Sequence, residues 1–462
     1  MFYLLAIDWS SVGIQAFYLI LSLSILVILH EFGHYLPAKL FKCKVEKFYL
    51  FFDPWFSLFK KKIGETVYGI GWLPLGGYVK IAGMVDESMD KEQMKQPPQP
   101  WEFRSKPAWQ RLIIMIGGVT VNVLVAFIIY AMLLFTWGEQ KLPNANAANG
   151  ITVVDTLMYS MGLKDGDKIL EVNDVPVPYF DDITKKLLIG QKLTVERDGK
   201  KQVIDLPKDL LGQLIEKKRS KTPLITPRVP MIVGFVADSS PALSVGLKPY
   251  DKILSVDSVA TPFFDEARTI LFAQRGKQVA LEIEREGKKM FVNPVIGQDG
   301  KLGIANMSYS YFPAELDSLG LLKVENRKYG FFESFPAGVR KTFETLGDYI
   351  DQFKKILSPE TGAYKGVGGF KSMGSIFPSY WGAWQAFWNI TAFFSIILAF
   401  MNLLPIPALD GGHVLFTLYE MVTGRKPNDK FLEYAQVVGM VLLLGLMLYA
   451  NGNDWFGWNR NK

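Results

Sequence analysis

The 462-residue sequence contains one cysteine, Cys43, and only three histidines. A single cysteine cannot form a disulfide within the chain, and it cannot build a cluster of thiolate ligands around a metal ion. The net charge of +6 is modest, and no block of lysine and arginine with interleaved aromatic residues marks a nucleic-acid surface. We therefore expect no nucleic acid among the partners of this protein.

Hydrophobic residues make up 49% of the chain and gather in four long stretches, whereas a long central part is polar. A membrane-spanning helix needs about 20 apolar residues. We predict four spans, with a buried core helix as the alternative for each, at about 12–29, 112–137, 386–404 and 434–450. The composition thus predicts a multi-pass α-helical membrane protein with soluble modules inserted between its spans.

Lysine and arginine residues are concentrated in the two short loops that follow the first and third predicted spans. The positive-inside rule places such loops in the cytoplasm, so both termini and the long central segment are expected on the other side. Residues 1–11 lack a basic segment and a small-residue cleavage site. We expect the first span to be a retained signal anchor rather than a cleaved signal peptide.

The central segment contains an internal repeat. The sequence GLKDGDKILEVN at 162–173 recurs as GLKPYDKILSVD at 246–257. Each copy is followed by β-prone residues around a charged turn, at Asp198-Gly199 and Glu286-Gly287, and such turns favour β-hairpins. We predict two copies of one small β-rich module, at residues 145–209 and 225–308.

The motif His30-Glu31-Phe32-Gly33-His34 closes the first predicted span. Its four-residue spacing places both imidazoles on one face of a helix, where they can bind one zinc ion. Glu31 lies beside them and can deprotonate a water activated by the metal. The motif occurs by chance in long sequences, but charged groups at membrane depth cost about 2.5–3.5 kcal/mol, which favours a functional site here.

A catalytic zinc ion takes a third protein ligand and leaves one position open. The segment from Asn402 to His413 reads NLLPIPALDGGH and ends the third predicted span. Two prolines are expected to break the helix and two glycines to let the backbone turn. From spacing alone, either Asp410 or His413 could be the third ligand.

An HExxH motif in a membrane span, paired with a distant Asn-x-x-Pro-x-Pro-x-Leu-Asp-Gly, resembles the site-2 proteases, which are intramembrane zinc metalloproteases. Two repeated modules between the second and third spans resemble tandem PDZ domains and narrow the likeness to the regulator of sigma-E protease type. The resemblance implies that His30, His34 and Asp410 coordinate Zn²⁺ and that Glu31 is the general base. It also implies that Asn402 holds the substrate backbone or the oxyanion, and it leaves His413 a supporting role.

Two further segments match the same family. Residues 66–82 read as two strands joined by a turn that contains Gly76 and Gly77, which implies a membrane-dipping β-hairpin that pairs with the substrate; the alternative is an ordinary cytoplasmic hairpin. Residues 117–122, GGVTVN, resemble the family element Gly-Pro-x-x-Asn, with Gly118 in place of the usual proline. This likeness implies a substrate-binding role for Asn122, and the alternative is close packing of helices through small residues.

The resemblance also implies the substrates and the location. These are single-span membrane proteins already cut outside the membrane, such as an anti-sigma factor or remnant signal peptides, in the lipid bilayer of the bacterial inner membrane. The PDZ modules would bind peptides by strand addition or exclude large proteins by size. A non-catalytic PDZ scaffold is the main alternative function, and a metal-dependent transporter is a weaker one.

The predicted organisation is completed by the segments that flank the two modules. Residues 1–137 carry the first two spans, and residues 383–462 carry the last two with the Leu-Asp-Gly motif. Between them, residues 325–382 contain an amphipathic helix at 331–357 and a glycine-rich connector at 362–374. We expect the helix to lie on the outer membrane surface or on the modules, and either element could control substrate entry.

Overall fold

The computed structural model describes residues 8–74, 76–84, 97–216 and 223–457. Within these ranges, four helices are long and apolar enough to cross a membrane. Each contains most of one predicted span, and they are α1 (Trp9–Leu40), α3 (Ala108–Thr136), α12 (Trp384–Leu403) and α14 (Asp429–Phe456). The prediction for residues 1–11 falls largely on 1–7, which lie outside the described residues.

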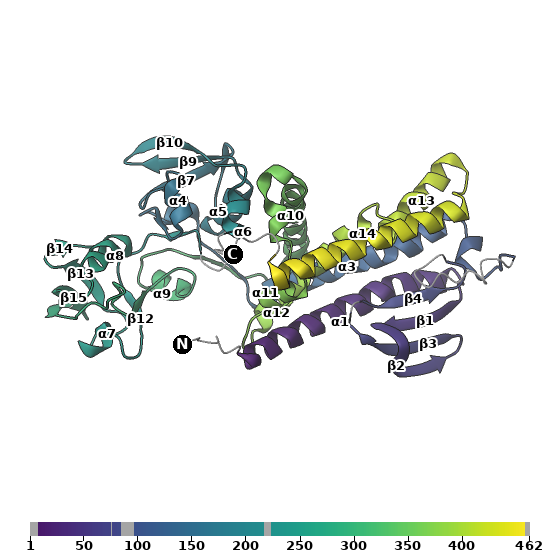
Figure 1. Cartoon of the computed structure of the whole chain (residues 1–462), viewed down its shortest axis with the longest axis horizontal. Coiled ribbons are helices and arrows are strands. Elements are labelled where there is room, and N and C mark those ends of the chain that lie inside the picture. The colour runs from purple at the N-terminus through teal and green to yellow at the C-terminus, as the bar shows by residue number, and fades with distance from the viewer. Residues whose placement is uncertain (1–7, 75, 85–96, 217–222, 458–462) are drawn as a thin grey trace.

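Helices α1 and α12 pack on α3, which lies at the centre of this bundle, and α14 runs in the same direction as α3 (Figure 1). Helix α3 packs against α1, α12 and the short helix α13 (Asp410–Thr423). It approaches α1 so closely that a Cβ atom on Gly33 would lie 2.4 Å from the carbonyl oxygen of Gly117. Small residues in both helices therefore bring the two backbones into direct contact.

Helix α1 extends well beyond the predicted span. Asp8 caps its first turn by accepting hydrogen bonds from the backbone N–H groups of Ser10 and Ser11, and the helix continues through the metal-binding motif to Leu40. At 1.5 Å per residue its 32 residues cover about 48 Å, more than the roughly 30 Å of a bilayer core. His30 and His34 thus lie within a continuous helix rather than at its end.

A four-stranded sheet lies beside the C-terminal half of α1, at the end of the bundle away from the modules (Figure 1). Its strand order is β2-β3-β1-β4. The strands are β1 (Val45–Leu50), β2 (Phe52–Ile63), β3 (Thr66–Leu73) and β4 (Tyr78–Ile81). Strand β3 pairs in parallel with β1, and β4 pairs with the other edge of β1 in the antiparallel sense.

This topology corrects the predicted hairpin at residues 66–82. Both predicted strands exist, but they do not pair with each other, because β1 lies between them. The hairpin partner of β3 is β2, through the turn at Gly64 and Glu65. The turn chemistry around Gly76 and Gly77 could not reveal this, since a glycine pair also suits the longer connection between strands that are not neighbours. Leu75 in this connection lies outside the described residues.

The central segment folds into two modules of the same topology. Module 1 comprises residues 142–216, 223–229 and 307–324, and module 2 comprises residues 231–306, of which Ile232 packs in the core of module 1. In module 1 the sheet order is β10-β9-β7-β8, and in module 2 it is β16-β15-β13-β14. The strands of module 1 are β6 (Ile151–Val153), β7 (Lys168–Val172), β8 (Val175–Pro176), β9 (Lys192–Arg197), β10 (Lys200–Asp205) and β11 (Ile225–Pro227). Those of module 2 are β12 (Val233–Val236), β13 (Lys252–Val256), β14 (Val259–Ala260), β15 (Leu281–Arg285), β16 (Lys288–Val292) and β17 (Ile304–Asn306).

Short helices complete each module in equivalent places. They are α4 (Thr156–Ser160) and α5 (Ile183–Ile189) in module 1, and α7 (Pro241–Ser244) and α8 (Phe264–Ala273) in module 2. Both predicted hairpin turns form: Arg197 pairs with Lys200 across Asp198-Gly199, and Arg285 pairs with Lys288 across Glu286-Gly287. All four turn residues have positive φ, as a type I′ turn requires.

The repeated aspartate makes the same contacts in both modules. Asp167 is fully buried and forms a bidentate ion pair with Arg197, with 2.7 Å between each pair of atoms. Asp251 is equally buried and pairs with Arg285 at 2.6 Å through each oxygen. Each arginine also donates to a glycine carbonyl at the start of its repeat. The sequence repeat therefore encodes a repeated ion-pair network.

Module 2 is an insertion within module 1, which corrects the predicted boundaries. The predicted boundary of 225–308 places β11 in the second module, but β11 pairs with β6 of module 1. After module 2, the chain returns through α9 (Pro313–Ser318), whose Leu316 is fully buried in the core of module 1. A repeat in the sequence shows which segments are equivalent, but it cannot show that residues from 307 to 324 rejoin the first core.

The amphipathic helix forms as α10 (Phe331–Leu357). In line with one of the two expectations it contacts module 1, where Asp348 pairs with Lys185 of α5, but most of its packing is against the bundle. It lies across α3, where a Cβ atom on Gly338 would be 2.7 Å from the backbone nitrogen of Ala131. Its far end meets α12 through contacts of Tyr349 and Phe353 with Phe400. The two short strands β5 (Glu139–Lys141) and β18 (Glu325–Arg327) pair beside it and join the bundle to module 1.

The glycine-rich connector is an ordered segment between module 1 and the bundle. It includes the start of α11 (Phe370–Ile376). It contacts the short helix α6 (Leu210–Glu216) of module 1, where Lys365 forms an ion pair with Glu216. At its other end, Asn453 donates to the carbonyls of Lys365 and Val367, at 2.9 Å each. The connector is thus fixed by polar contacts on both sides.

Candidate metal centre

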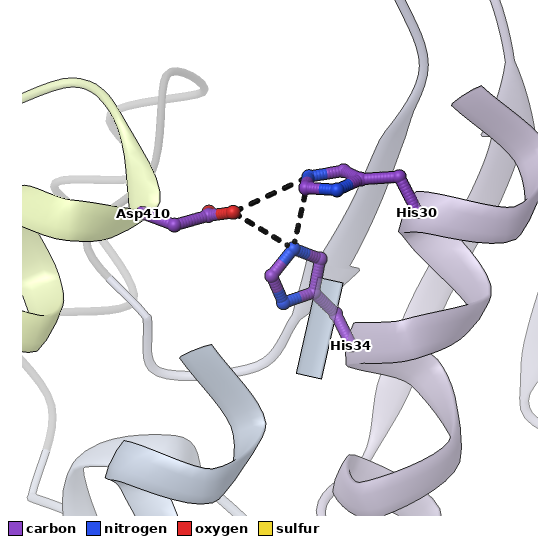
Figure 2. Close-up of side chains that lie close together, drawn as sticks. All are labelled: His30, His34 and Asp410. Atoms are coloured by element: carbon purple, nitrogen blue, oxygen red, sulfur yellow. Dashed lines mark hydrogen bonds and ion pairs between the residues drawn. The ribbon is translucent and has the colours of Figure 1, made fainter. Parts of the chain in front are cut away.

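Three metal-binding side chains that are far apart in the sequence meet in the bundle. His30 and His34 extend from α1 toward Asp410, the first residue of α13 (Figure 2). The Nε2 atoms of His30 and His34 lie 3.3 and 3.2 Å from Oδ2 of Asp410, and 3.3 Å from each other. Among the described residues, this is the group of histidine, cysteine and acidic side chains that could hold a metal ion.

The spacing of these donor atoms fits zinc. Ligand atoms lie about 2.0–2.1 Å from a tetrahedral zinc ion, which places any two of them about 3.3 Å apart. The three donor atoms form a nearly equilateral triangle of that size. His34 is 6% exposed and Oδ2 of Asp410 is buried without a hydrogen bond, so a cation here would satisfy an otherwise uncompensated oxygen.

A backbone carbonyl orients the ring of His34. Its Nδ1 atom lies 2.8 Å from the carbonyl oxygen of Ile114 on α3. Nδ1 must therefore carry the proton and donate it, which leaves the Nε2 lone pair facing Asp410, as metal ligation requires. No sequence pattern indicates this contact, because every residue has a carbonyl group.

Asn122 orients the ring of His30 in the same way. Its amide lies 3.2 Å from Nδ1 of His30, and Asn122 is fully buried. The amide nitrogen faces the ring, while Oδ1 is buried without a partner. We infer that the amide is rotated by 180°, so that Nδ1–H of His30 donates a hydrogen bond to Oδ1 of Asn122. The Nε2 lone pair of His30 is then free to bind a metal ion. The predicted substrate-binding role of Asn122 stays a prediction; in the structure its side chain contacts His30, one of the three convergent donors.

Gly118, one helical turn before Asn122, is another point of close approach between α1 and α3. Counting back four residues from Asn122 places Gly118, not Gly117, at the glycine of the Gly-Pro-x-x-Asn element, with Val119 at its proline. A Cβ atom on Gly118 would lie 2.4 Å from Nε2 of His34 and 2.6 Å from Cε1 of His30. Only a glycine leaves room for both imidazoles at this position.

The loop between α12 and α13 places Asp410. Pro405 and Pro407 lie in this loop, as predicted, and the residue with positive φ is Ala408 (φ 86°). Gly411 and Gly412 do not form a turn; they begin α13, where a Cβ atom on Gly411 would be 2.1 Å from the carbonyl oxygen of Leu404. The glycines therefore allow close packing of the helix on its own loop.

The structure separates the two candidates for the third ligand. His413 lies one turn after Asp410 on α13 and is outside the group of three convergent donors. It lines the same cavity as Asp410, and its backbone carbonyl accepts a hydrogen bond from Thr417. The geometry favours Asp410.

A cavity of about 630 Å³ opens at the three donors, and we refer to it as the catalytic cavity. Glu31 lines it beside His30 and His34, and β4 lines it with all four of its residues. A smaller cavity of about 280 Å³ adjoins it on the side of α12 and is lined by Glu31, Gly76, Gly77 and Asn402. The Nδ2 atom of Asn402 lies 3.4 Å from Nε2 of His30. The predicted site residues thus surround one space, with the exception of Asn122.

Comparison with known proteins identifies the class. The profile of Peptidase family M50 matches residues 18–446. The chain therefore belongs to this family, and the predicted membership in the site-2 proteases is confirmed.

Several named proteins are similar to the chain over nearly its whole length. The Regulator of sigma-E protease RseP of Escherichia coli (strain K12) is 27% identical, over 94% of this chain and 97% of that protein. The Regulator of sigma E protease of Haemophilus influenzae is 26% identical, with the same coverage. A protein of Borreliella burgdorferi named as a zinc metalloprotease is 28% identical, over 95% and 97%. The chain is thus a zinc metalloprotease of the membrane.

Proposed function

We propose that this protein cleaves the transmembrane segments of single-span proteins within the membrane, with His30, His34 and Asp410 as ligands to Zn²⁺. The observation that carries the proposal is the convergence of Asp410 on the two imidazoles of α1, a long apolar helix, with 3.2–3.3 Å between the donor atoms. The carbonyl of Ile114 orients the ring of His34, and the amide of Asn122 orients the ring of His30. A transmembrane helix that reaches this site needs no passage through water.

The catalytic roles follow from the placement of the side chains. Zinc, when bound, lowers the pKa of a water molecule and polarises the carbonyl group of a substrate. Glu31 lines both cavities beside the metal ligands, so it takes the proton of the attacking water and passes it to the leaving nitrogen. The amide of Asn402 reaches the same space and is placed to donate a hydrogen bond to the substrate carbonyl or to the oxyanion.

Strand β4 is the proposed docking edge for the unwound substrate. Within the described residues it pairs only with β1, and all four of its residues line the catalytic cavity. A helix that unwinds in a membrane loses its internal hydrogen bonds, and pairing as an added strand replaces them. Gly77 permits this approach, because a Cβ atom there would lie 2.6 Å from Val27 and 3.3 Å from Glu31. Gly76, with φ of 151°, directs the chain into β4.

Modules 1 and 2 are the proposed PDZ domains, and we place them in the periplasm of a bacterial inner membrane. They lie at the opposite end of the bundle from the sheet and α13 (Figure 1), which suits the cytoplasmic orientation of the lysine-rich loops. Similarity to regulators of sigma-E protease supports an anti-sigma factor, or remnant signal peptides, as substrates after a first cut outside the membrane. The modules would then exclude uncut proteins by size.

One assay separates proteolysis from a non-catalytic PDZ scaffold. Purified protein is incubated with a single-span reporter peptide in detergent or vesicles, with Glu31→Gln and a zinc chelator as controls. We expect cleavage by the wild type, loss of cleavage in both controls, and bound zinc retained in Glu31→Gln. Cleavage that survives in Glu31→Gln contradicts the role of Glu31, and binding without cleavage by the wild type favours the scaffold.

The size filter has its own test. Deleting both modules is expected to allow cleavage of a full-length substrate that the intact protein leaves uncut. The deletion must extend to residue 324, because Met307, Leu316 and Leu322 belong to the core of module 1. Continued discrimination between full-length and trimmed substrates would show that the modules are not the filter.

A further inference from the structure

A second cavity continues from the catalytic cavity beyond Asp410. It has a volume of about 230 Å³ and lies among α3, α13 and α14. Ala408, His413 and Gln436 line both cavities, so the two spaces meet at these residues. We refer to the second space as the basic cavity, because its charged lining residues are Arg104, Arg111, Lys426 and Glu420.

Gln436 and His413 are the polar residues at the junction, and Gln436 comes from a different helix than the three donors. It lies in α14 and is 6% exposed. Its side chain makes no hydrogen bond with any residue that the structure describes, although it borders both cavities. Its amide is not among the buried polar groups that lack a partner, so it keeps accessible surface in the cavities and can hydrogen-bond to an occupant. An amide that both donates and accepts suits a peptide backbone, which offers one N–H and one C=O per residue.

The charges around the basic cavity favour an anionic occupant. Three cations and one anion among its lining residues give a formal charge of +3 − 1 = +2. Arg111 is held by Glu420 at 2.6 Å, and the Nε atom of Arg104 lies 2.6 Å from Glu102, just outside the lining. Lys426 is exposed and donates to the carbonyl of Arg104 at 3.3 Å. With Glu102 included, the described residues around the cavity carry a formal charge of +2 − 1 = +1.

We propose that the basic cavity is a substrate subsite for the residues that follow the catalytic cavity, where Gln436 hydrogen-bonds to the substrate backbone and the cations select an acidic side chain. This inference rests on the proposed function. An extended peptide covers about 3.3 Å per residue, so a few residues beyond the scissile bond reach past Gln436. Helix α14 then takes part in substrate binding as well as in spanning the membrane.

The test measures binding in the Glu31→Gln background, so that cleavage does not consume the peptide. Three fluorescent single-span peptides differ only in Glu, Gln or Lys at the residues just beyond the cleavage site on the cytoplasmic side. We expect the Glu peptide to bind best and the Lys peptide worst, by about two- to five-fold per charge. Lys426→Gln should reduce that difference, whereas it should change binding of the Gln peptide little.

Substitution of Gln436 supplies the second arm. Gln436→Leu should weaken binding of all three peptides by about three- to ten-fold, the effect of losing one or two neutral hydrogen bonds. Gln436→Glu should weaken the Glu peptide most, because it adds a negative charge at the junction. Val438→Ala, on the exposed face of the same helix, is the matched control and should bind like the unsubstituted protein.

The outcomes distinguish this inference from the proposed function. In one outcome, the wild type cleaves the reporter while Gln436→Leu and Gln436→Glu bind each peptide as tightly as the Glu31→Gln parent does. That result contradicts the subsite and leaves the proposed protease function intact. Equal binding of the Glu and Lys peptides contradicts the charge selection. If the wild type cleaves no peptide and Glu31→Gln binds none, the proposed function itself fails.

Discussion

The side-chain amide of Asn122 on α3 lies 3.2 Å from Nδ1 of His30 on α1. This contact holds the imidazole at Nδ1, while Nε2 on the other side of the ring faces Asp410. It explains why an asparagine in the middle of an apolar helix is fully buried, and it links the packing of α1 against α3 to the affinity of the metal centre.

Replacing Asn122 tests that link. Asn122→Leu should lower zinc affinity about 10- to 100-fold, the usual effect of losing the hydrogen-bond partner of a metal-bound histidine. Asn122→Asp retains an acceptor for Nδ1–H and should bind zinc nearly as the wild type does. Competition with a zinc chelator measures the affinity, and circular dichroism checks the helix content. Equal zinc affinity in Asn122→Leu would exclude an orienting role.

Gly118 should tolerate no side chain. Gly118→Ala places a Cβ atom within 2.4–2.6 Å of both imidazoles, so the rings must move and we expect loss of bound zinc and of proteolysis. Gly445→Ala on α14 is the control, since a Cβ atom there meets nothing within 4 Å. Zinc content is measured by mass spectrometry and proteolysis by the reporter assay. Normal zinc content in Gly118→Ala would contradict the close approach of Gly118 to the two imidazoles.

The buried ion pairs of the modules should contribute much more stability than exposed pairs. Asp251→Ala leaves Arg285 without its bidentate partner and should lower the free energy of opening of module 2 by about 3 kcal/mol. Asp299→Ala removes an exposed pair with Lys301 and should change it by less than about 1 kcal/mol. Hydrogen exchange of the β13 and β15 amides in the full chain gives both values. Similar values for the two variants would show that burial of Asp251 adds nothing.

The contact between β5 and α10 should weaken only in acid. Burial disfavours the charged form of Glu139, but ion pairs with Lys341 and Lys141 outweigh it and hold the pKa of Glu139 below its ordinary value of 4.5. A lowered carboxylate pKa stabilises the folded state above about pH 4.5, and this stability is lost as the pH falls through the folded pKa.

Hydrogen exchange in the first turns of α10 is the measurement for Glu139. Protection should be constant from pH 7 to about pH 5, after correction for the intrinsic exchange rate, and should fall below pH 4.5. Glu139→Gln should show weaker protection at neutral pH and little further loss in acid. The same acid-dependent loss in Glu139→Gln would assign the effect to other groups.

The sequence alone determined the chemistry of this protein. The HExxH spacing places two imidazoles on one helical face because the helix repeats every 3.6 residues, and the four apolar stretches exceed what a bilayer requires. The internal repeat identified two equivalent modules, down to the turn residues with positive φ. These features are local, since each depends on residues that are close together in the chain, and local periodicity is what a sequence records.

The tertiary structure decided the relationships between distant segments. It brought Asp410 rather than His413 to the histidines, placed β1 between the two predicted hairpin strands, and returned residues 307–324 to module 1. It also turned Asn122 toward His30 and left Gln436 facing two cavities. None of these follows from spacing, because contacts over tens or hundreds of residues depend on how whole helices and strands pack, and many pairings satisfy the same local pattern.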